Sequence, residues 1–363
     1  MSASAPTPRL YIGLMSGTSL DGVDGVVFDA ERMAVLAHAY APFLPELRDD
    51  LLALNTPGPN ELHRAALAAS EISRSYADVV RQLRMAHPDV ALVCAHGQTV
   101  RHRPVMGYTL QLLNGALLAE LCGLDVVCDL RSRDVAAGGQ GAPLVPAFHR
   151  AVFGRAGEDV AVLNLGGISN LSLLHADGRT LGFDTGPGNC LLDGWILRHQ
   201  GERFDHDGAW GAQGQVLPEL LARLLADRFF RLPPPRSTGR DVFHLDWLEA
   251  HLSPGLDPRD VQATLCELAA RCVTDALQLH QPALSRLVVS GGGARNAALM
   301  ARLGALLPNV RVQASSELGL PVDQVEAAAF AWLGHRFVTR QPGNLPEVTG
   351  AAGLRLLGAL YPA

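Results

Sequence analysis

A carboxylate inside a glycine-rich stretch is the leading candidate for chemistry in this chain. Asp184 stands within residues 182–189, which read Gly-Phe-Asp-Thr-Gly-Pro-Gly-Asn, between an apolar run ending at Leu181 and a helical pattern over 190–200. The sequence therefore predicts an acid in a turn at the carboxyl end of a strand, where α/β proteins bind their ligands. A carboxylate there could act as a general base. The alternative is an ordinary aspartate that caps the turn.

Three other glycine-containing turns favour a binding role for this region over the capping alternative. The first is the tip of a hairpin predicted within residues 10–29, and the second begins at Gly166 and Gly167. The third, residues 291–293, lies between a predicted core strand and a helix. Backbone N–H groups in such turns suit phosphate, although the hairpin taken alone is more often an ordinary one. The glycine spacing in the third turn is not the Rossmann fingerprint.

The chain contains no lysine, so arginine supplies all 30 of its Lys and Arg side chains. This excludes Schiff-base and pyridoxal-phosphate chemistry, which needs a lysine amine. It also excludes the lysines of the Walker A loop and of protein kinases. Any phosphate bound here must be held by backbone N–H groups, hydroxyls, arginine or a metal ion.

Length and composition indicate a two-domain globular enzyme. The 363 residues exceed the usual size of one domain, and a hydrophobic content of 48% is enough for large cores. The net charge of −6 argues against a nucleic-acid or anionic-membrane partner. The first residues lack a signal-peptide layout, and no apolar run reaches membrane-spanning length. Six scattered cysteines without a Cys-x-x-Cys pair indicate free thiols and a cytoplasmic location.

Two further candidates follow predicted strands in the first half. His96 comes after a strand expected over 90–94, and Arg131 lies in the charged run 129–134 after a strand expected over 124–128. Side chains at strand ends are well placed for a site. The charged run, which precedes a glycine-rich stretch, is expected to cross between domains or face a cleft. The alternatives are a buried structural histidine and a solvated charge run.

Glu326 is a candidate acid at the start of an apolar helix near the C-terminus. Asp323 stands three residues before it, which is the spacing of a capping box. The structural interpretation of Glu326 is therefore that it caps this helix, and the functional one is that it faces a reacting group.

Several strings taken together resemble the anhydro-N-acetylmuramic acid kinase family, within the superfamily of actin-like ATPases and sugar kinases. The resemblance covers essentially the whole chain. It implies an α/β fold with two related actin- or hexokinase-like domains and a nucleotide cleft between them. We expect residues 1–130 with 341–363 to form one domain, and residues 131–340 the other. The strings are GLMSGTSLDGVD, AHGQTV, DLRSRDVAAGGQGAPLVPAFH, NLGGISNLS, GFDTGPGN, STGRD, DVQATL and VVSGGGARNAALM.

The resemblance implies an activity and a set of site residues. The family uses ATP, with Mg²⁺, to open 1,6-anhydro-N-acetylmuramic acid with water and phosphorylate O6. Asp184 would be the base and Glu326 a second acid, with His96 and Arg131 in the sugar pocket; the metal ligands stay unassigned. Nucleotide contacts are expected from the three turns and from an asparagine three residues beyond the last glycine: Gly17, Thr18, Ser19, Leu20, Asp21, Gly22, Val23, Asp24, Gly166, Gly167, Gly291, Gly292, Gly293 and Asn296.

Two other functions stay open on the sequence. One keeps the fold and phosphorylates an ordinary hydroxyl of a sugar or acid, without adding water. The other is an ATP-gated chaperone or filament protein, although no insertion or long tail for such a role stands out in the sequence. A homodimer is also left open.

Overall fold

The computed structural model describes residues 9–17, 20–234 and 236–363 and divides the chain into two compact units. The first unit comprises the residues up to Phe148 together with Gln324–Ala363, and the second is His149–Asp323. The boundaries expected at 130/131 and 340/341 therefore lie elsewhere. The reason is the late helix α11 (Val325–Val338), which packs against strands of the first unit and belongs to it.

The first unit is built on a six-stranded sheet with the order β13-β7-β4-β1-β2-β3. Strands β1, β4 and β7 are parallel, whereas β1, β2 and β3 form an antiparallel meander. A separate hairpin of β5 and β6 completes its β-structure. The strands are β1 (Leu10–Met15), β2 (Gly22–Asp29), β3 (Ala34–Pro42), β4 (Leu92–Ala95), β5 (Gln98–Arg103), β6 (Tyr108–Leu112), β7 (Asp125–Cys128) and β13 (Ala359–Tyr361).

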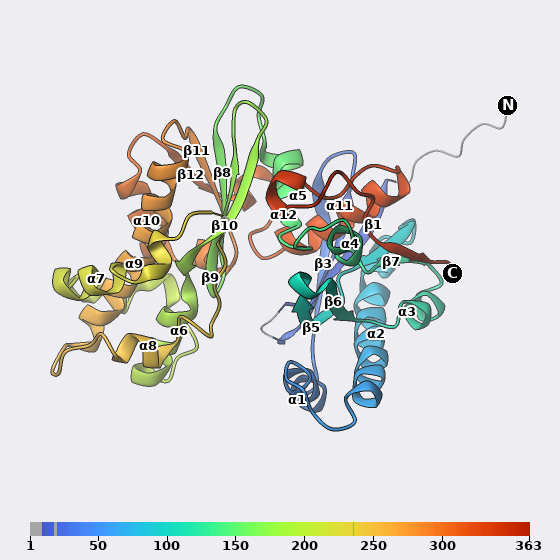
Figure 1. Ribbon diagram of the computed structural model, residues 1–363, viewed down its shortest axis with the longest axis horizontal. Helices are drawn as coiled ribbons and strands as arrows, with labels where there is room; N and C mark the ends of the chain where they lie inside the picture. The colour runs from blue at the N-terminus through green and yellow to red at the C-terminus, as the bar shows by residue number, and fades with distance from the viewer. Residues whose placement is uncertain (1–8, 18–19, 235) are drawn as a thin grey trace. The chain divides into compact units, whose positions relative to one another are not determined.

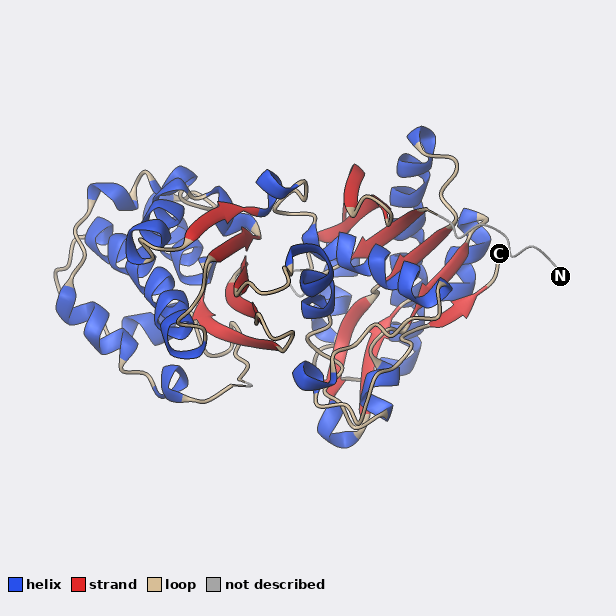
Figure 2. Ribbon diagram, turned by 90° about the horizontal axis from the view of Figure 1, so that it is seen from above, coloured by secondary structure: helices blue, strands red, loops and turns tan. Residues whose placement is uncertain are grey.

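Helices cover both faces of this sheet (Figure 2). On one face, Ile12 and Leu14 of β1 join the core that α2 completes. On the other, Gly13 lets α11 approach, because a Cβ there would lie 2.0 Å from the Ala327 carbonyl oxygen. The helices are α1 (Pro45–Ala53), α2 (Glu61–Ala86), α3 (Gly115–Cys122), α4 (Ser132–Ala136), α11, α12 (Pro346–Thr349) and α5 (Val145–Phe153), which runs across the unit boundary.

The second unit contains a five-stranded sheet with the order β10-β9-β8-β11-β12 (Figure 1). Leu163 and Leu165 of β8 pack with residues of α9 and α10 in its core. The elements are β8 (Val160–Leu165), β9 (Ile168–Leu174), β10 (Thr180–Pro187), β11 (Arg286–Ser290), β12 (Arg311–Ala314), α6 (Asn189–Gln200), α7 (Pro218–Leu225), α8 (Leu245–Glu249), α9 (Pro258–His280) and α10 (Ala297–Leu306). Short 3₁₀ turns include His206–Gly208, Gly211–Gln213, Arg228–Arg231 and Gly292–Arg295.

The two sheets repeat one topology. In each unit, the first three strands form an antiparallel meander, and the next two pair in parallel beside the first strand. The orders β3-β2-β1-β4-β7 and β10-β9-β8-β11-β12 are therefore equivalent. The expectation of an α/β fold with two related domains is confirmed.

Two local expectations around the candidate acids are wrong. Asp184 lies within β10 and pairs with Asn170 of β9, so the strand continues past Leu181 to Pro187. The capping box at Glu326 does not form either: Gln324 is the N-cap, without a side-chain cap bond, and Asp323 instead pairs with Arg295. The charged run is no crossing between units, since its end forms α4 within the first unit.

Within the described residues, no helix is both long enough and apolar enough to span a bilayer.

Candidate functional site

Three glycine-containing turns meet at the carboxyl ends of strands β8, β10 and β11 in the second unit. The backbone N–H of Gly188 donates to the Gly167 carbonyl at 2.9 Å, and that of Asn189 donates to the Gly166 carbonyl at 2.9 Å. These bonds fix the turn after β8 to the start of α6. Backbone groups from separate segments are thereby gathered in a small region, as a phosphate site requires.

Two glycines of the turn after β11, Gly291 and Gly293, pack so closely on β8 that they exclude side chains, whereas a Cβ on Gly292 would meet open space. Gly291 has φ +80°, and a Cβ there would lie 2.5 Å from the Asn164 Oδ1. A Cβ on Gly293 would lie 2.7 Å from the Cβ of Leu165. The glycines are therefore explained by packing as well as by access for a ligand, and the Asn296 that follows them caps α10 through the Leu299 N–H at 3.0 Å.

One segment, residues 236–240, holds Asp184 in place. The Oδ2 of Asp184 accepts hydrogen bonds from the Ser237 hydroxyl at 3.0 Å and from the Thr238 N–H at 2.9 Å. The Asp184 N–H donates to the Arg236 carbonyl at 3.0 Å, and the Arg236 Nε donates back to the Asp184 carbonyl at 3.0 Å. Within the described part of the chain, no donor binds Oδ1, which is left to face a ligand.

Burial raises the pKa of Asp184 above its ordinary value of 3.8, although the two donors on Oδ2 and the nearby Arg236 oppose the shift. A raised pKa makes the ionised form a stronger proton acceptor than an exposed aspartate. With one oxygen fixed and the other free, the carboxylate is arranged to take a proton from a bound water or hydroxyl.

Sequence reasoning missed the role of the 236–240 segment. The string STGRD entered only as part of a resemblance, and nothing in its composition connects Ser237 or Thr238 to an acid more than fifty residues earlier. The usable signal was the cluster of small hydroxyl and glycine residues, which favours loops that donate to carboxylates.

Two adjoining pockets lie beside the third glycine turn. One, of about 500 Å³, is lined by Gly292, Gly293 and Asn296 together with Asp193 and Phe204. Burial raises the pKa of Asp193 to about 6. Because this pocket contacts the turn expected to hold adenosine, it is the stronger candidate for a nucleoside. The second, of about 400 Å³, shares Leu192, Asp205 and Asn296 with it.

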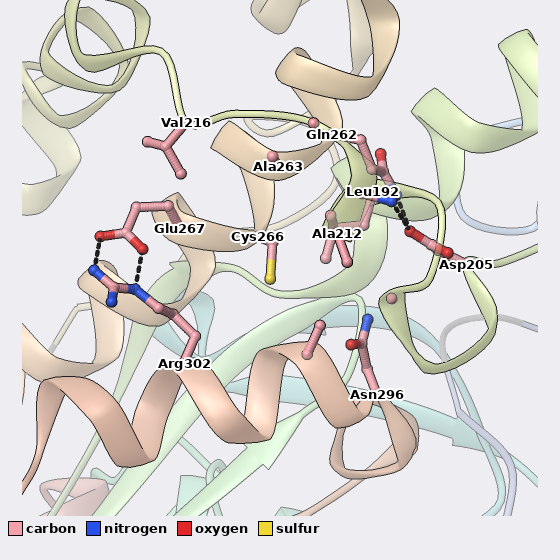
Figure 3. A pocket seen from close by; sticks show the side chains of 14 residues that line it. Leu192, Asp205, Ala212, Val216, Gln262, Ala263, Cys266, Glu267, Asn296 and Arg302 are labelled. Atoms are coloured by element: carbon pink, nitrogen blue, oxygen red, sulfur yellow. Dashed lines mark hydrogen bonds and ion pairs between the residues drawn. The ribbon is translucent and has the colours of Figure 1, made fainter.

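The polar groups of the second pocket are largely engaged with one another (Figure 3). Glu267 pairs with Arg302, and Gln262 donates to Asp205 at 3.4 Å. The sulfur of Cys266 points into the pocket, and burial raises the pKa of this thiol to about 11, so it stays protonated near neutral pH. This pocket offers space next to the nucleoside candidate, without a reactive group.

The expected phosphate hairpin of the first unit is formed by β1 and β2, which pair Met15 with Asp24. Thr18 and Ser19, at its tip, lie outside the described residues. Its base is held from β5 and the residues before it: the Gln98 Nε2 donates to the Gly17 carbonyl at 3.2 Å, and the Ser16 hydroxyl donates to the Gly97 carbonyl at 3.1 Å.

His96 and Arg131 contact each other directly. The Arg131 Nε and Nη2 lie 3.1 and 2.9 Å from the His96 Nε2. Because a guanidinium only donates, Nε2 must accept, and the ring proton resides on Nδ1. Burial and the Arg131 charge lower the pKa of His96 to about 3, so the ring is neutral. Its buried Nδ1 has no hydrogen-bond partner among the described residues, although the Ser16 and Gly97 carbonyls lie nearby.

Glu326 lies in the first turn of α11, in the same part of the first unit. Its side chain is reached by solvent, yet the dense protein around it raises the pKa of its carboxyl; Asp24 raises it further and Arg131 opposes the shift. The Arg131 guanidinium thus donates to the His96 ring and is close enough to Glu326 for their charges to interact. Asp24, His96, Arg131 and Glu326 therefore lie within the first unit, whereas the boundaries expected from the sequence placed Arg131 and Glu326 in the other domain.

The buried carboxylate of Asp134 fixes the segment that contacts Arg131. Asp134 accepts hydrogen bonds from Asn344 at 2.7 Å, from Thr349 at 2.8 Å and from the Gly141 N–H at 2.8 Å. The Gly141 carbonyl in turn accepts from the Arg131 Nη1 at 2.8 Å. The residues after Arg131 are therefore fixed to a segment near the C-terminus, a contact that no local sequence pattern predicts.

The expected site residues thus form two groups, each within one unit. The first unit holds Gly17, Leu20, Asp21, Gly22, Val23, Asp24, His96, Arg131 and Glu326, and the second holds Gly166, Gly167, Asp184, Gly291, Gly292, Gly293 and Asn296.

Comparison with known proteins connects this geometry to a family. The sequence profile described as anhydro-N-acetylmuramic acid kinase matches residues 9–363. The chain belongs to the anhydro-N-acetylmuramic acid kinase family. A protein of that name from Variovorax paradoxus is 59% identical, over 98% of this chain and 99% of that protein. One from Cupriavidus pinatubonensis is 54% identical, over 97% and 98%.

The fold is shared more widely than the sequence. The crystal structure of component A of the Acidaminococcus fermentans (R)-2-hydroxyglutaryl-CoA dehydratase matches with a TM-score of 0.50 at 14% identity, covering 91% of this chain and 99% of that one. At this identity the likeness concerns the fold alone. Membership of the anhydro-N-acetylmuramic acid kinase family makes the chain an ATP-using sugar kinase, built on two α/β units whose sheets share one topology.

Kinases of this kind are expected to use ATP with Mg²⁺. No group of three His, Cys, Asp or Glu side chains among the described residues is arranged to hold a metal ion. Mg²⁺ bound with a nucleotide keeps several waters and takes its other ligands from phosphate oxygens and one or two carboxylates.

Proposed function

We propose that this kinase opens 1,6-anhydro-N-acetylmuramic acid with water and transfers the γ-phosphoryl group of ATP to O6. The products are N-acetylmuramic acid 6-phosphate and ADP. The observation that supports this most strongly is Asp184, a partly buried carboxylate with a raised pKa, one fixed oxygen and one free oxygen, beside turns suited to phosphate.

The substrate dictates why an ordinary kinase mechanism is insufficient. In the anhydro sugar, O6 is bonded to C1, so no free 6-hydroxyl exists. Water must attack C1 while the C1–O6 bond breaks, and O6 then takes the γ-phosphoryl group. Asp184 accepts the proton of the attacking water, as the base of an inverting glycosidase does. Phosphoryl transfer itself depends mainly on positioning and charge neutralisation.

The residues of the first unit have complementary roles in this proposal. Arg131 and His96 bind the sugar: after its bonds to His96 and Gly141, the guanidinium has further N–H groups available, and the His96 Nδ1–H is a donor without a partner. Glu326 lies close enough to Arg131 and Asp24 for their charges to act on its pKa, and serves as a second acid near the reacting water.

Three turns are proposed to contact the nucleotide: the hairpin of residues 17–24, the turn at Gly166 and Gly167, and the turn Gly291–Gly293. The hairpin of residues 17–24 in the first unit and the turn at Gly166 and Gly167 in the second both bind the phosphates of ATP. Gly291–Gly293 and Asn296 contact the adenosine. Mg²⁺ bound with ATP would neutralise phosphate charge, and Asp24 and Glu326, the carboxylates beside the hairpin, would hold its waters.

The cellular setting is part of the same proposal. All six cysteines are free thiols, as expected for a protein of the reducing cytoplasm, where ATP is available. No nucleic-acid or membrane partner is expected, and a homodimer stays a prediction that sedimentation of the purified enzyme would test.

An isotope experiment tests the reaction. In ¹⁸O-labelled water, the product is expected to carry label on the C1 hydroxyl, because C1 must gain an oxygen when the bridge opens. The oxygen that joins C6 to phosphorus should stay unlabelled, since it is the sugar's own O6. Mass spectrometry with fragmentation, at times short against solvent exchange at C1, locates the label. NMR over the same interval should show an inverted C1 hydroxyl.

Three results would contradict the proposal. Label in the C6–O–P bridge would mean that the ring opens by another route before phosphorylation. Efficient phosphorylation of an unbridged sugar, with no requirement for the anhydro bond, would support an ordinary hydroxyl kinase. ATP hydrolysis that does not respond to any sugar would instead favour a nucleotide-gated protein of another class.

Substitution of one glycine in each phosphate turn tests the shared nucleotide site. Gly17→Val and Gly167→Val are each expected to weaken ATP binding about tenfold or more by calorimetry, because both turns must approach the same phosphates closely. Gly58→Val is the matched control, since a Cβ there would meet open space. If only one of the two site variants lost affinity while both stayed folded, the two turns would not share the ligand.

A further inference from the structure

We propose that Arg240 binds the phosphates of ATP at the Gly166 and Gly167 turn and supplies the cationic side chain that a lysine provides in many other kinases. This proposal rests on the proposed function, because it names one more residue of the same site. The chain has no lysine, so a fixed positive charge near the transferred phosphoryl group must come from arginine. In the sequence, Arg240 belongs to the string STGRD, but no local pattern assigns it a role.

The first support is the position of the guanidinium. A Cβ placed on Gly167 would lie 2.9 Å from the Arg240 Nη2, 3.1 Å from its Nε and 3.4 Å from its Cζ. Three atoms of one planar group at similar distances mean that the guanidinium lies against the turn, over the α-carbon of Gly167. A ligand phosphate that approaches the backbone N–H groups of this turn would meet the Arg240 donors beside them.

The second support is that Arg240 has no partner of its own. Within the described residues it makes no hydrogen bond or ion pair, and it is exposed to solvent. Arg236 in the same segment is different, because its side chain donates to the carbonyls of Asp184, Phe230 and Leu232. Asp193 lies close enough for the Arg240 charge to lower its pKa against the effect of burial, but it is not paired with it.

The third support is the segment that carries Arg240. Ser237 and Thr238 bind the Oδ2 of Asp184, and Arg240 follows two residues later at the Gly167 turn. A single short loop therefore positions the proposed base and places a cation on the proposed phosphate turn. A solvated surface arginine would have no reason to lie flat on a glycine turn between these two features.

The chemistry suits arginine. Its guanidinium stays charged and offers planar donors that match two phosphate oxygens at once. Phosphoryl transfer spreads negative charge over the equatorial oxygens of the transferred group, and an arginine held in the same chain stabilises that charge. Arg240 is thus expected to act both on bound ATP and, more strongly, on the transition state.

The test compares Arg240→Gln with Arg240→Lys and a matched control. Arg240→Gln is expected to lower kcat roughly 10²–10³-fold, the usual loss for one charge-stabilising donor. Arg240→Lys should recover part of this loss, since it restores the charge but not the planar pair of donors. Arg311→Gln is the control, because Arg311 begins β12, at the opposite end of the sheet from the turns that follow β8 and β11. It should keep the wild-type rate.

Calorimetry gives a readout that does not depend on the sugar reaction. Arg240→Gln is expected to weaken ATP binding about tenfold, because one hydrogen bond to a charged group is lost, while adenosine binding stays unchanged. An unchanged ratio of ATP to adenosine affinity would overturn the proposal, whatever the rate does. If the wild-type enzyme failed to turn over the anhydro sugar, the proposed function would fall, and the nucleotide titration would still decide the role of Arg240.

Discussion

Asp184→Asn is expected to lower the turnover of anhydro sugar by roughly 10²–10⁴-fold, the usual range for loss of a general base. The variant retains the shape of the side chain. Its carbonyl oxygen can take the place of Oδ2 and accept the Ser237 and Thr238 donors, which leaves an NH₂ group where the free carboxylate oxygen was. That group cannot accept a proton from water, so the chemical step should suffer while ATP affinity, measured by calorimetry, should hardly change.

The raised pKa of Asp184 predicts how the rate and the stability of the wild type depend on pH. As a base it works only when ionised, so the kcat/KM of the wild type should fall as the pH drops through the raised pKa. The free energy of unfolding changes in the opposite direction with pH. The folded protein holds this proton more tightly than the unfolded chain, so ionisation of Asp184 costs stability as the pH rises from about 3.8 through the raised value. Asp184→Asn should escape that loss.

Asp177→Asn is the control for these experiments. Asp177 lies in the exposed turn between β9 and β10 and pairs with Arg179, at the end of the hairpin away from the glycine turns. It should keep both rate and pH profile. Near-complete activity in Asp184→Asn, with the Asp177 control also active, would remove Asp184 as the base.

Glu326→Gln is expected to give the second large effect, a loss of roughly 10²-fold or more in turnover with unchanged thermal stability. The structure removes the competing explanation, because Glu326 makes no capping box and the N-cap of α11 is Gln324. Glutamine keeps the size and polarity of the side chain. The loss should therefore reflect the ionisable proton and the charge next to Arg131.

Melting measurements keep this prediction separate from a structural role. Because the dense protein around Glu326 and the charge of Asp24 raise its pKa against the opposing effect of Arg131, its ionised form costs stability near neutral pH, and the Gln variant should melt at the same or a slightly higher temperature. Glu120→Gln, on the exposed side of α3, serves as the control. An unchanged rate in Glu326→Gln would return this residue to a purely structural role.

Local sequence determined most of the elements. Apolar runs predicted the paired strands of the first hairpin and the core strands β4, β7 and β11, since these are buried and need little beyond their own composition. Asp257 followed by Pro258 is typical of a helix start, and the Asp257 side chain accepts from the Arg259 N–H at the N-terminus of α9. The absence of lysine, readable only from the sequence, restricts the phosphate chemistry to arginine, backbone and metal.

Tertiary structure decided what these elements could not encode alone. Asp184 belongs to β10 because β9 pairs with it across a bulge, and a turn-like composition of three glycines and a proline does not reveal that ladder. The Asp323 carboxylate forms an ion pair with Arg295, from a distant turn, and does not cap α11. The unit boundary at 323/324 follows from the packing of α11 on β1, where Gly13 leaves room for the helix backbone.

For the candidate site too, the sequence determined some features and the tertiary structure others. The sequence by itself singled out the acids and the glycine turns, because their residue types and their places after strands carry the chemistry. Only the fold could bring residues 236–240 to Asp184, place Arg240 over Gly167 and join Arg131 to His96. Each of these contacts links segments far apart in the chain, so it depends on the long-range pairing and packing of strands and helices that no local pattern specifies.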